Sequence, residues 1–253
     1  MPAIGKHAFV TGGGSGIGLA IAKALAKQQW HVTIAGRNKA RLQAAIGAIP
    51  GARLRVVDVT KPDSVEGALH AAVDINGPVQ LLVNNAGAVT SAPFEKTGLA
   101  VWRQSLDLNL MGAVHCTHAV LADMKAARWG RIVNIASTAG LVGYRYVSAY
   151  VAAKHALVGF TKALALEVAT SGVTVNAICP GFTDTDIISN AVKTISKASN
   201  RSSVDALATF TAANPQGRLV RPDEVAAAVL WLASEEAAAV NGIALPIAGG
   251  EVA

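Results

Sequence analysis

The sequence has only two cysteines among its 253 residues, Cys116 and Cys179. A disulfide framework needs several cysteines, and a metal site needs closely spaced ligand residues, so this pair supports neither. We therefore expect no bound metal. A chain without disulfides fits a reducing compartment, and a cytoplasmic protein is the simplest interpretation.

Long hydrophobic runs are also lacking. The longest unbroken apolar stretch, residues 225–233, is far shorter than the roughly 20 residues that cross a bilayer. The first residues show no charged start followed by a long apolar stretch and a cleavage site, so we expect no signal peptide. Association with a membrane is not predicted.

Charged residues are few. Asp, Glu, Lys and Arg make up 15% of the chain and hydrophobic residues 52%, which is typical of a chain with a well-buried core. The net charge is +6, but the basic residues are scattered, with no basic run and no interleaved aromatics. Nucleic-acid binding is therefore not predicted. The positive balance fits an anionic cofactor or substrate better.

Short apolar, β-branched runs alternate with helical patterns along almost the whole chain. This alternation predicts an α/β fold: a Rossmann-type, doubly wound parallel sheet with helices on both faces. No linker, repeat or low-complexity tract divides the chain, so we expect residues 1–253 to form a single domain. The predicted strands cover residues 7–10, 31–35, 53–57, 80–83, 131–136, 174–178 and 243–246. The predicted helices cover residues 17–27, 39–46, 62–74, 99–128, 148–170 and 222–233.

One connection is much longer than the others. Residues 182–217 join a strand end to the last predicted helix and are rich in Ser, Thr, Asn and Ala. Connections this long in a compact domain are usually lids or binding loops. We predict a substrate lid, because the segment follows the carboxyl end of a strand, where parallel α/β sheets bind ligands. The alternative is a surface excursion with short helices of its own.

A glycine-rich turn, TGGGSGIG, joins the first predicted strand to the first predicted helix. Glycines at such a turn let the backbone bend sharply and approach a pyrophosphate, and the helix N-terminus offers N–H groups to the phosphates. The spacing departs from a strict GxGxxG, but the position between strand and helix predicts a dinucleotide site. The predicted cofactor residues in this turn are Gly12, Ser15, Gly16, Ile17 and Gly18.

The end of the second predicted strand indicates which dinucleotide binds. It carries no carboxylate for a ribose 2′-hydroxyl, whereas Arg37, assisted by Arg41, suits a 2′-phosphate. The sequence therefore favours NADP(H), with NAD(H) as the alternative and a solvated surface arginine as the simpler interpretation of Arg37. After the third predicted strand, Asp58 and Val59 are placed to hold the adenine edge by hydrogen bonding and packing.

Ser137, Tyr150 and Lys154 are the most informative residues of the chain. Tyr150 and Lys154 are four apart in a predicted helix and so share one helical face. Ser137 follows a predicted strand, at the sheet edge where ligands bind. A hydroxyl, a phenol and a cation that meet there suit proton transfer to or from an alcohol oxygen. The simpler alternative is a solvated helix face and a serine that caps a turn.

Taken together, these motifs resemble the short-chain dehydrogenase/reductase family over nearly the whole chain. The resemblance implies hydride transfer between a nicotinamide and a carbonyl or secondary alcohol. One departure is Ala248, which precedes the final Gly-Gly where the family usually has Asp. The motifs that carry the resemblance are TGGGSGIG, NNAG at residues 84–87, Asn109, Ser137, Tyr150-x-x-x-Lys154 and Pro180-Gly181.

The resemblance also implies roles for individual residues. Tyr150 would be the general acid in reduction and the general base in oxidation, with its pKa lowered by the positive charge of Lys154. Lys154 would also hold the nicotinamide ribose, and Ser137 would orient the carbonyl oxygen. Asn109 would bend its helix and hold a water that links Lys154 to solvent; for an isolated Asn in a helix, a surface position is the alternative. Further cofactor contacts are implied for Asn85, Ala86, Gly87, Pro180, Gly181 and Thr183.

The substrate is indicated by longer stretches. GRIVNIAST, KHALVGFTKALALE and NAICPGF look most like acyl-thioester ketoreductases, which reduce 3-oxoacyl groups carried by coenzyme A or acyl carrier protein. An NAD-dependent secondary or cyclic alcohol dehydrogenase of catabolism is the alternative, and a dinucleotide-sensing scaffold is the non-enzyme alternative. The resemblance further implies a homotetramer, or a dimer, formed through residues 99–128 and 148–170. Candidate pocket-wall residues are Gly140, Val142, Tyr144, Tyr146, Phe182 and Ile188.

Overall fold

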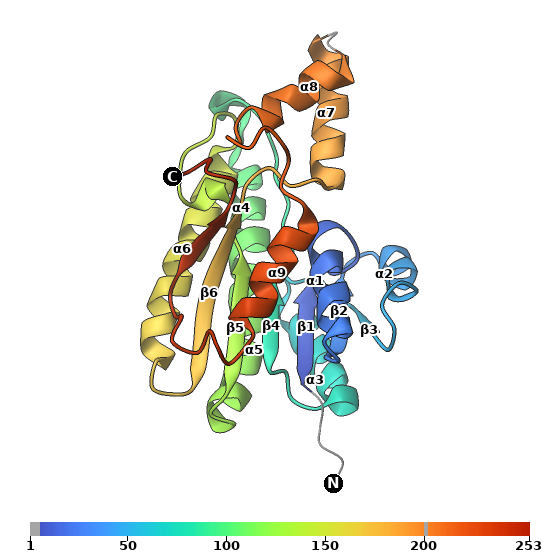
Figure 1. The fold of residues 1–253 in the computed structure, drawn as a ribbon, viewed down its shortest axis with the longest axis vertical. Helices are drawn as coiled ribbons and strands as arrows, with labels where there is room; N and C mark the ends of the chain where they lie inside the picture. The colour runs from blue at the N-terminus through green and yellow to red at the C-terminus, as the bar shows by residue number, and fades with distance from the viewer. Residues whose placement is uncertain (1–5, 200–201) are drawn as a thin grey trace.

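A seven-stranded, all-parallel sheet forms the centre of the protein in the computed structural model, which describes residues 6–199 and 202–253 (Figure 1). The strand order is β3-β2-β1-β4-β5-β6-β7. This confirms the predicted doubly wound sheet and each predicted strand, with small shifts at the strand ends. The strands are β1 (His7–Thr11), β2 (His31–Gly36), β3 (Arg53–Val56), β4 (Leu81–Asn84), β5 (Gly130–Ile135), β6 (Val173–Pro180) and β7 (Ala244–Ile247).

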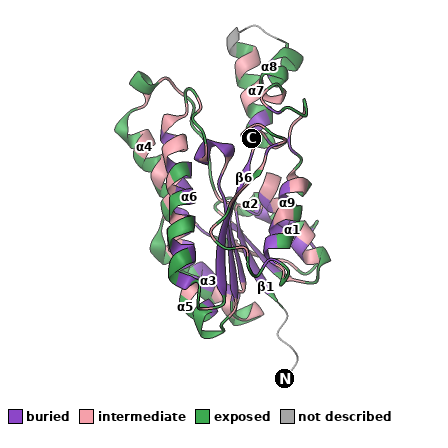
Figure 2. Cartoon of the chain, turned by 60° about the vertical axis from the view of Figure 1, so that its left-hand side comes forward, coloured by how far each residue is buried: buried purple, intermediate pink, exposed green. Residues whose placement is uncertain are grey.

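Helices cover both faces of the sheet, because its central strands are apolar on both sides (Figure 2). On one face α1 (Gly16–Lys27) packs against α9 (Pro222–Leu232), with α2 (Lys39–Ile46) beside them. The other face carries α3 (Pro62–Asn76), α5 (Gly112–Ala126) and α6 (Ser148–Val168). Within the described residues, no helix has the length and hydropathy required to cross a membrane.

The order of the strands reverses between β1 and β4. From β1 the sheet grows toward β2 and β3 on one side, and toward β4 and the later strands on the other. In sheets of this type ligands bind at the carboxyl ends of the strands, at this reversal. The fold therefore places the ends of β1, β4 and β5 where the sequence predicts cofactor and catalytic residues.

The predicted helix over residues 99–128 is interrupted by a π-helical turn. It consists of α4 (Leu99–Leu106), the π turn η2 (Asp107–Met111) and α5. A π turn accommodates one extra residue without ending the helix, so the hydrophobic pattern continues and does not reveal it. The break lies at Asn109, one of the predicted site residues.

The segment over residues 182–217 is mostly helical, which corrects its treatment as a loop. It contains α7 (Asp186–Ser199) and α8 (Ser203–Thr211), while residues 200 and 201 lie outside the described part. The two helices pack on each other and project beyond the carboxyl edge of the sheet (Figure 1). This arrangement matches the alternative of an excursion with its own helices, and a lid function stays a prediction.

Candidate active site

The glycine-rich turn between β1 and α1 requires glycine for two different reasons. Gly12 and Gly16 have positive φ angles of 66° and 51°, which side chains disfavour. A Cβ at Gly18 would collide with the carbonyl of Gly12 and lie 2.5 Å from the amide nitrogen of Asn85. The tight turn leads directly into α1, whose first N–H groups have no partner within the helix. This cradle fits a pyrophosphate.

The NNAG segment is bonded to the same turn. The backbone N–H groups of Asn85 and Ala86 donate to Thr11 Oγ1 at 2.9 and 3.0 Å. The Asn85 side chain donates to the Thr11 carbonyl at 2.9 Å. These bonds hold the carboxyl ends of β1 and β4 together, so the structure brings the two predicted cofactor motifs side by side.

Two exposed arginines lie beyond the end of β2. Arg41 donates to Ser15 Oγ at 3.4 Å and lies 3.9 Å from the carboxylate of Asp186. Arg37 is equally exposed and its charge acts on Asp58. Both arginines thus lie near the place predicted for a ribose phosphate, and Arg41 reaches the glycine-rich turn.

Asp58 and Val59 follow β3, as the sequence indicates. Burial alone would raise the pKa of Asp58, but hydrogen bonds from Thr60 and the charge of Arg37 lower it overall. The Asp58 carboxylate accepts the Thr60 hydroxyl at 2.8 Å and the Thr60 N–H at 3.1 Å. The Val59 side chain is buried and packs against Gly112 of α5, where a Cβ would lie 2.7 Å from it.

Ser137, Tyr150 and Lys154 meet at the carboxyl end of β5, as predicted. The Ser137 hydroxyl lies near enough to the Tyr150 phenol to lower its pKa. Lys154 Nζ lies 5.6 Å from the centre of the Tyr150 ring and donates to the Ile135 carbonyl at 2.8 Å. Ser137 Oγ also accepts the N–H of Ala139, which caps the short helix η3 (Thr138–Gly140). The hydroxyl, the phenol and the amine therefore form one cluster.

Burial drives the pKa values of Tyr150 and Lys154 in opposite directions. It raises the pKa of Tyr150 to about 12, although the hydrogen bond with Ser137 lowers it, and it lowers the pKa of Lys154 to about 8. Both shifts favour the uncharged form, as desolvation does. The lowering of the Tyr150 pKa expected from Lys154 is therefore not observed in the protein alone, where desolvation of the phenol is the largest influence on this pKa.

Asn109 is buried in the π turn, which excludes the interpretation as a surface residue. Its amide oxygen accepts the N–H of Ala88 at 3.2 Å, and its amide nitrogen donates to the carbonyls of Ala88 and Ser105, both at 3.0 Å. A Cβ at Gly87 would lie 2.7 Å from Asn109 Oδ1 and 3.6 Å from Lys154 Nζ. Asn109 thus fixes the segment after β4 close to Lys154, and its water-holding role stays a prediction.

The end of β6 contributes Pro180, Gly181 and Thr183. Gly181 donates its N–H to the Ile247 carbonyl at 3.1 Å, and the buried Thr183 hydroxyl donates to the Gly181 carbonyl at 2.9 Å. These bonds fix the backbone next to the cluster of Ser137, Tyr150 and Lys154. The predicted residues of this segment therefore lie at the same edge of the sheet as Ser137.

The predicted wall residues do not all lie on one surface. Tyr144 packs edge-on against Phe182, with ring centres 6.0 Å apart, and Phe182 packs against Phe210 of α8 at 5.1 Å. Gly140 is instead buried against the backbone of Lys154. Val142 and Tyr146 are exposed, whereas Ile188 is buried in α7.

Sequence reasoning missed three residues of this region, Thr138, Phe210 and Glu251. The Tyr144 hydroxyl is hydrogen-bonded to Thr138 Oγ1 at 2.8 Å and to Oε1 of Glu251, and Phe210 extends the aromatic contact into α8. Glu251 lies 107 positions beyond Tyr144, so no local pattern links them. A charged residue just after the final Gly-Gly was the one available signal.

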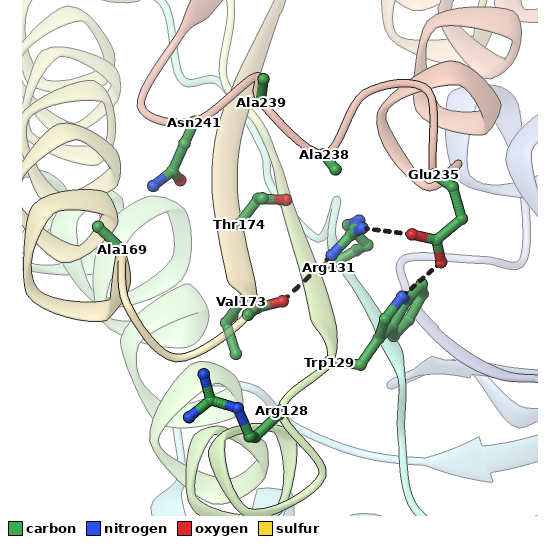
Figure 3. A pocket seen from close by; sticks show the side chains of 11 residues that line it. Arg128, Trp129, Arg131, Ala169, Val173, Thr174, Glu235, Ala238, Ala239 and Asn241 are labelled. Atoms are coloured by element: carbon green, nitrogen blue, oxygen red, sulfur yellow. Dashed lines mark hydrogen bonds and ion pairs between the residues drawn. The ribbon is translucent and has the colours of Figure 1, made fainter.

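A cavity of about 420 Å³ lies away from this cluster, at the amino ends of β5 and β6 (Figure 3). Its buried Arg131 lies 4.4 Å from the centre of the Trp129 ring and 3.6 Å from the Glu235 carboxylate. None of the predicted catalytic or cofactor residues lines it.

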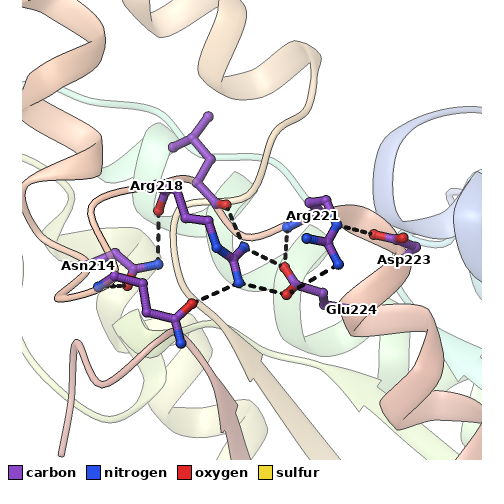
Figure 4. A network of polar contacts seen from close by, with 7 residues as sticks. Asn214, Arg218, Arg221, Asp223 and Glu224 are labelled. Atoms are coloured by element: carbon purple, nitrogen blue, oxygen red, sulfur yellow. Dashed lines mark hydrogen bonds and ion pairs between the residues drawn. The ribbon is translucent and has the colours of Figure 1, made fainter.

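A polar network anchors the end of the 182–217 segment to the start of α9 (Figure 4). Arg218 pairs with Glu224 at 2.7 Å, and the Asn214 amide donates to the Arg218 carbonyl at 2.9 Å. Glu224 also accepts the N–H of Arg221 at 2.8 Å. The network fixes the base of the helical excursion at the edge of the sheet.

Known proteins resemble this chain in both sequence and fold. Residues 6–196 match the family described as short chain dehydrogenase. A D-beta-hydroxybutyrate dehydrogenase of Cupriavidus necator is 41% identical, with 98% of each chain covered. The 3-oxoacyl-[acyl-carrier-protein] reductase FabG of Vibrio cholerae is 39% identical, with 97% of each covered. A crystal structure of an actinorhodin polyketide ketoreductase variant with NADPH superposes with a TM-score of 0.95, at 38% identity over 99% of both chains.

Proposed function

The chain belongs to the short-chain dehydrogenase/reductase family and is a nicotinamide-dependent oxidoreductase of carbonyl and alcohol groups, and on this basis we propose that it reduces 3-oxoacyl thioesters to 3-hydroxyacyl thioesters with NADPH. The observation that carries the proposal is the cluster of Ser137, Tyr150 and Lys154 beside the glycine-rich turn. The names of the acyl-carrier-protein reductase and the polyketide ketoreductase support the substrate class.

In this proposal the cofactor lies along the carboxyl edge of the sheet and supplies the hydride. Gly12, Ser15, Gly16, Ile17 and Gly18 hold the pyrophosphate at the turn that leads into the N-terminus of α1. Arg37 and Arg41 bind the 2′-phosphate, which favours NADP(H) over NAD(H). The other proposed contacts are Asp58, Val59, Asn85, Ala86, Gly87, Tyr150, Lys154, Pro180, Gly181 and Thr183.

The proposed chemistry of the protein is the delivery of one proton. Ser137 donates a hydrogen bond to the carbonyl oxygen and so fixes its position as negative charge develops there. The pKa of Tyr150 is about 12 in the protein alone, so its hydroxyl is protonated at neutral pH. Tyr150 gives this proton to the carbonyl oxygen. Lys154 stabilises the phenolate that remains, and Asn109 keeps the segment beside Lys154 in place.

We also propose a cytoplasmic homotetramer, or a dimer, in which the 182–217 segment closes over the substrate. The contact of Phe210 in α8 with Phe182 near the cluster supports a lid. Apolar side chains exposed on α4 and α6, Leu99 and Leu166, support a contact between subunits.

The test follows NADPH and NADH oxidation by the purified protein with a panel of ketones. The panel contains acetoacetyl-CoA, a short thioester mimic, a cyclic ketone and an aryl ketone. Preference for NADPH with the thioesters would support the proposal and the role of Arg37. Preference for NADH with the cyclic or aryl ketones would contradict both and would identify an alcohol dehydrogenase that uses the same cluster.

A further inference from the structure

The chain places a carboxylate beside its catalytic cluster. Glu251 follows two glycines with positive φ angles, Gly249 (62°) and Gly250 (96°), which turn the C-terminal segment back toward the sheet. The C-terminus lies at the same end of the molecule as α7 and α8 (Figures 1 and 2). Glu251 thus reaches the carboxyl edge of the sheet from a part of the chain that no catalytic motif includes.

The hydrogen bonds of Tyr144 fix the position of this carboxylate. The phenol has a single proton, and an ionised carboxylate can only accept, so Tyr144 donates to Oε1 of Glu251 and receives the proton of Thr138 Oγ1 at 2.8 Å. Thr138 directly follows the catalytic Ser137. The chain of contacts from Ser137 to Glu251 therefore consists of one peptide bond and two hydrogen bonds.

On its other side Glu251 touches the end of β6. A Cβ at Gly181 would collide with Oε2 of Glu251, so a side chain there would displace the carboxylate from its present position. Gly181 lies between Pro180 and Phe182, and Phe182 packs edge-on against Tyr144 at 6.0 Å. The half-buried carboxylate therefore lies between Tyr144 and the segment that follows β6.

The negative charge of Glu251 is poorly compensated. Its Oε2 atom is buried and has no hydrogen-bond partner in the described part of the chain. Among residues 6–199 and 202–253, no Lys, Arg or His forms an ion pair with it. Burial accordingly raises the pKa of Glu251, although the bond from Tyr144 lowers it. A second negative charge near this site would be disfavoured, because no ion pair in the described part of the chain neutralises Glu251.

We propose that Glu251 is a specificity-determining residue that rejects substrates with a free carboxylate one carbon away from the reacting carbonyl. The site would then accept neutral 3-oxoacyl esters and thioesters and discriminate against free 3-oxo acids. This inference rests on the proposed reductase function and adds the substrate charge that the site selects. Like charges brought close together in an interface are a common basis of such rejection.

The test compares two substrates that differ in charge, ethyl acetoacetate and acetoacetate, at mildly alkaline pH. Wild-type protein should prefer the ester. Glu251→Gln keeps the side-chain volume and an oxygen that accepts from Tyr144, but removes the charge. It should raise kcat/KM for acetoacetate by about tenfold and leave the ester and the Kd of NADPH within about twofold, as expected for removal of one nearby like charge.

Two control variants separate charge from structure. Glu251→Asp keeps the charge and should retain the discrimination. Glu235→Gln removes a carboxylate that accepts from Trp129 at the other end of the sheet, and it should leave the substrate ratio unchanged. The inference is overturned if Glu251→Gln leaves the ratio at the wild-type value, or if Glu251→Asp relaxes it equally.

Failure of the inference can be distinguished from failure of the proposed function. If the ester is reduced and the ratio is insensitive to Glu251→Gln, only the role of Glu251 is wrong. If ethyl acetoacetate, acetoacetate and acetoacetyl-CoA are all left unreduced, the proposed function is wrong. The charge selection is then measured with ethyl 2-oxocyclohexanecarboxylate and 2-oxocyclohexanecarboxylate, which have the carboxyl group one carbon from the carbonyl, and the absence of the same change in ratio overturns the inference.

Discussion

Tyr150 is the single residue on which the proposed chemistry depends most directly. Its hydroxyl is the proposed proton donor, and its ring lies close to Lys154. Tyr150→Phe removes only that oxygen, so we expect kcat to fall by about a thousandfold, within the range for loss of a general acid. The Kd of NADPH, measured by fluorescence titration, should change little.

A matched control for this substitution exists in the same segment. Tyr146 is 60% exposed, and Tyr146→Phe should retain near wild-type turnover. Substantial turnover by Tyr150→Phe would contradict the assignment of the proton donor. Loss of cofactor binding together with turnover would instead indicate a structural role for Tyr150.

Lys154 provides a prediction about stability and pH in the protein without cofactor. Its pKa is about 8 in the folded protein, against 10.5 for an ordinary lysine. Between these two pH values the unfolded chain binds more protons than the folded chain, so the contribution of Lys154 to stability rises as pH increases. The penalty for burying its charge applies below about pH 8.

The measurement compares urea unfolding of wild type and Lys154→Met from neutral pH to about pH 10. The free energy of unfolding of wild type should rise relative to that of the variant across the upper half of this range. Lys125→Met, at an exposed position of α5, controls for loss of a lysine as such. A difference that stays constant with pH would contradict the lowered pKa.

At the scale of elements, the turn between β1 and α1 depends on the absence of a side chain at Gly18. In Gly18→Ala the new methyl group meets the Gly12 carbonyl, so the turn must open where the pyrophosphate is expected. We expect the affinity for NADPH to fall at least about tenfold, as loss of a well-placed hydrogen-bond donor set would cause. Isothermal titration calorimetry measures this change.

Gly67 is a suitable control for that prediction. It lies inside α3 with open space around its Cβ position. Gly67→Ala should therefore leave NADPH binding unchanged and stabilise the protein by about 0.5–1 kcal/mol, through the better helix propensity of Ala. Equal losses of affinity in both variants would show that the effect is not local to the turn.

The elements also show what the sequence could and could not predict. Alternating apolar runs identified the strands because parallel strands are buried on both faces. Ile188, Val192 and Ile195 recur at helical spacing within α7, but the Ser- and Thr-rich composition of the segment obscured this signal. The π turn at Asn109 depends on bonds to Ala88, which is remote in sequence. The site was predictable where motifs are local, whereas Glu251 depends on the tertiary fold.

At the scale of the whole molecule, the proposed assembly depends on apolar side chains that the single chain leaves exposed. Leu166 on α6 is 81% exposed and Leu99 on α4 is 74% exposed, and α4 packs against α6. Both residues thus belong to one helical layer on the outside of the sheet. Covering them with the same layer of a second copy would remove them from water, which is the main favourable contribution to such interfaces.

Leu166→Glu should therefore shift the protein to a smaller species, because an uncompensated carboxylate would be buried in the contact. Light scattering coupled to size-exclusion chromatography gives the mass of each species. Val204→Glu, on α8 at 76% exposure, is the matched control and should keep the wild-type mass. If Val204→Glu dissociates the assembly and Leu166→Glu does not, subunits meet through the helical excursion rather than through α4 and α6, and the lid could not close freely.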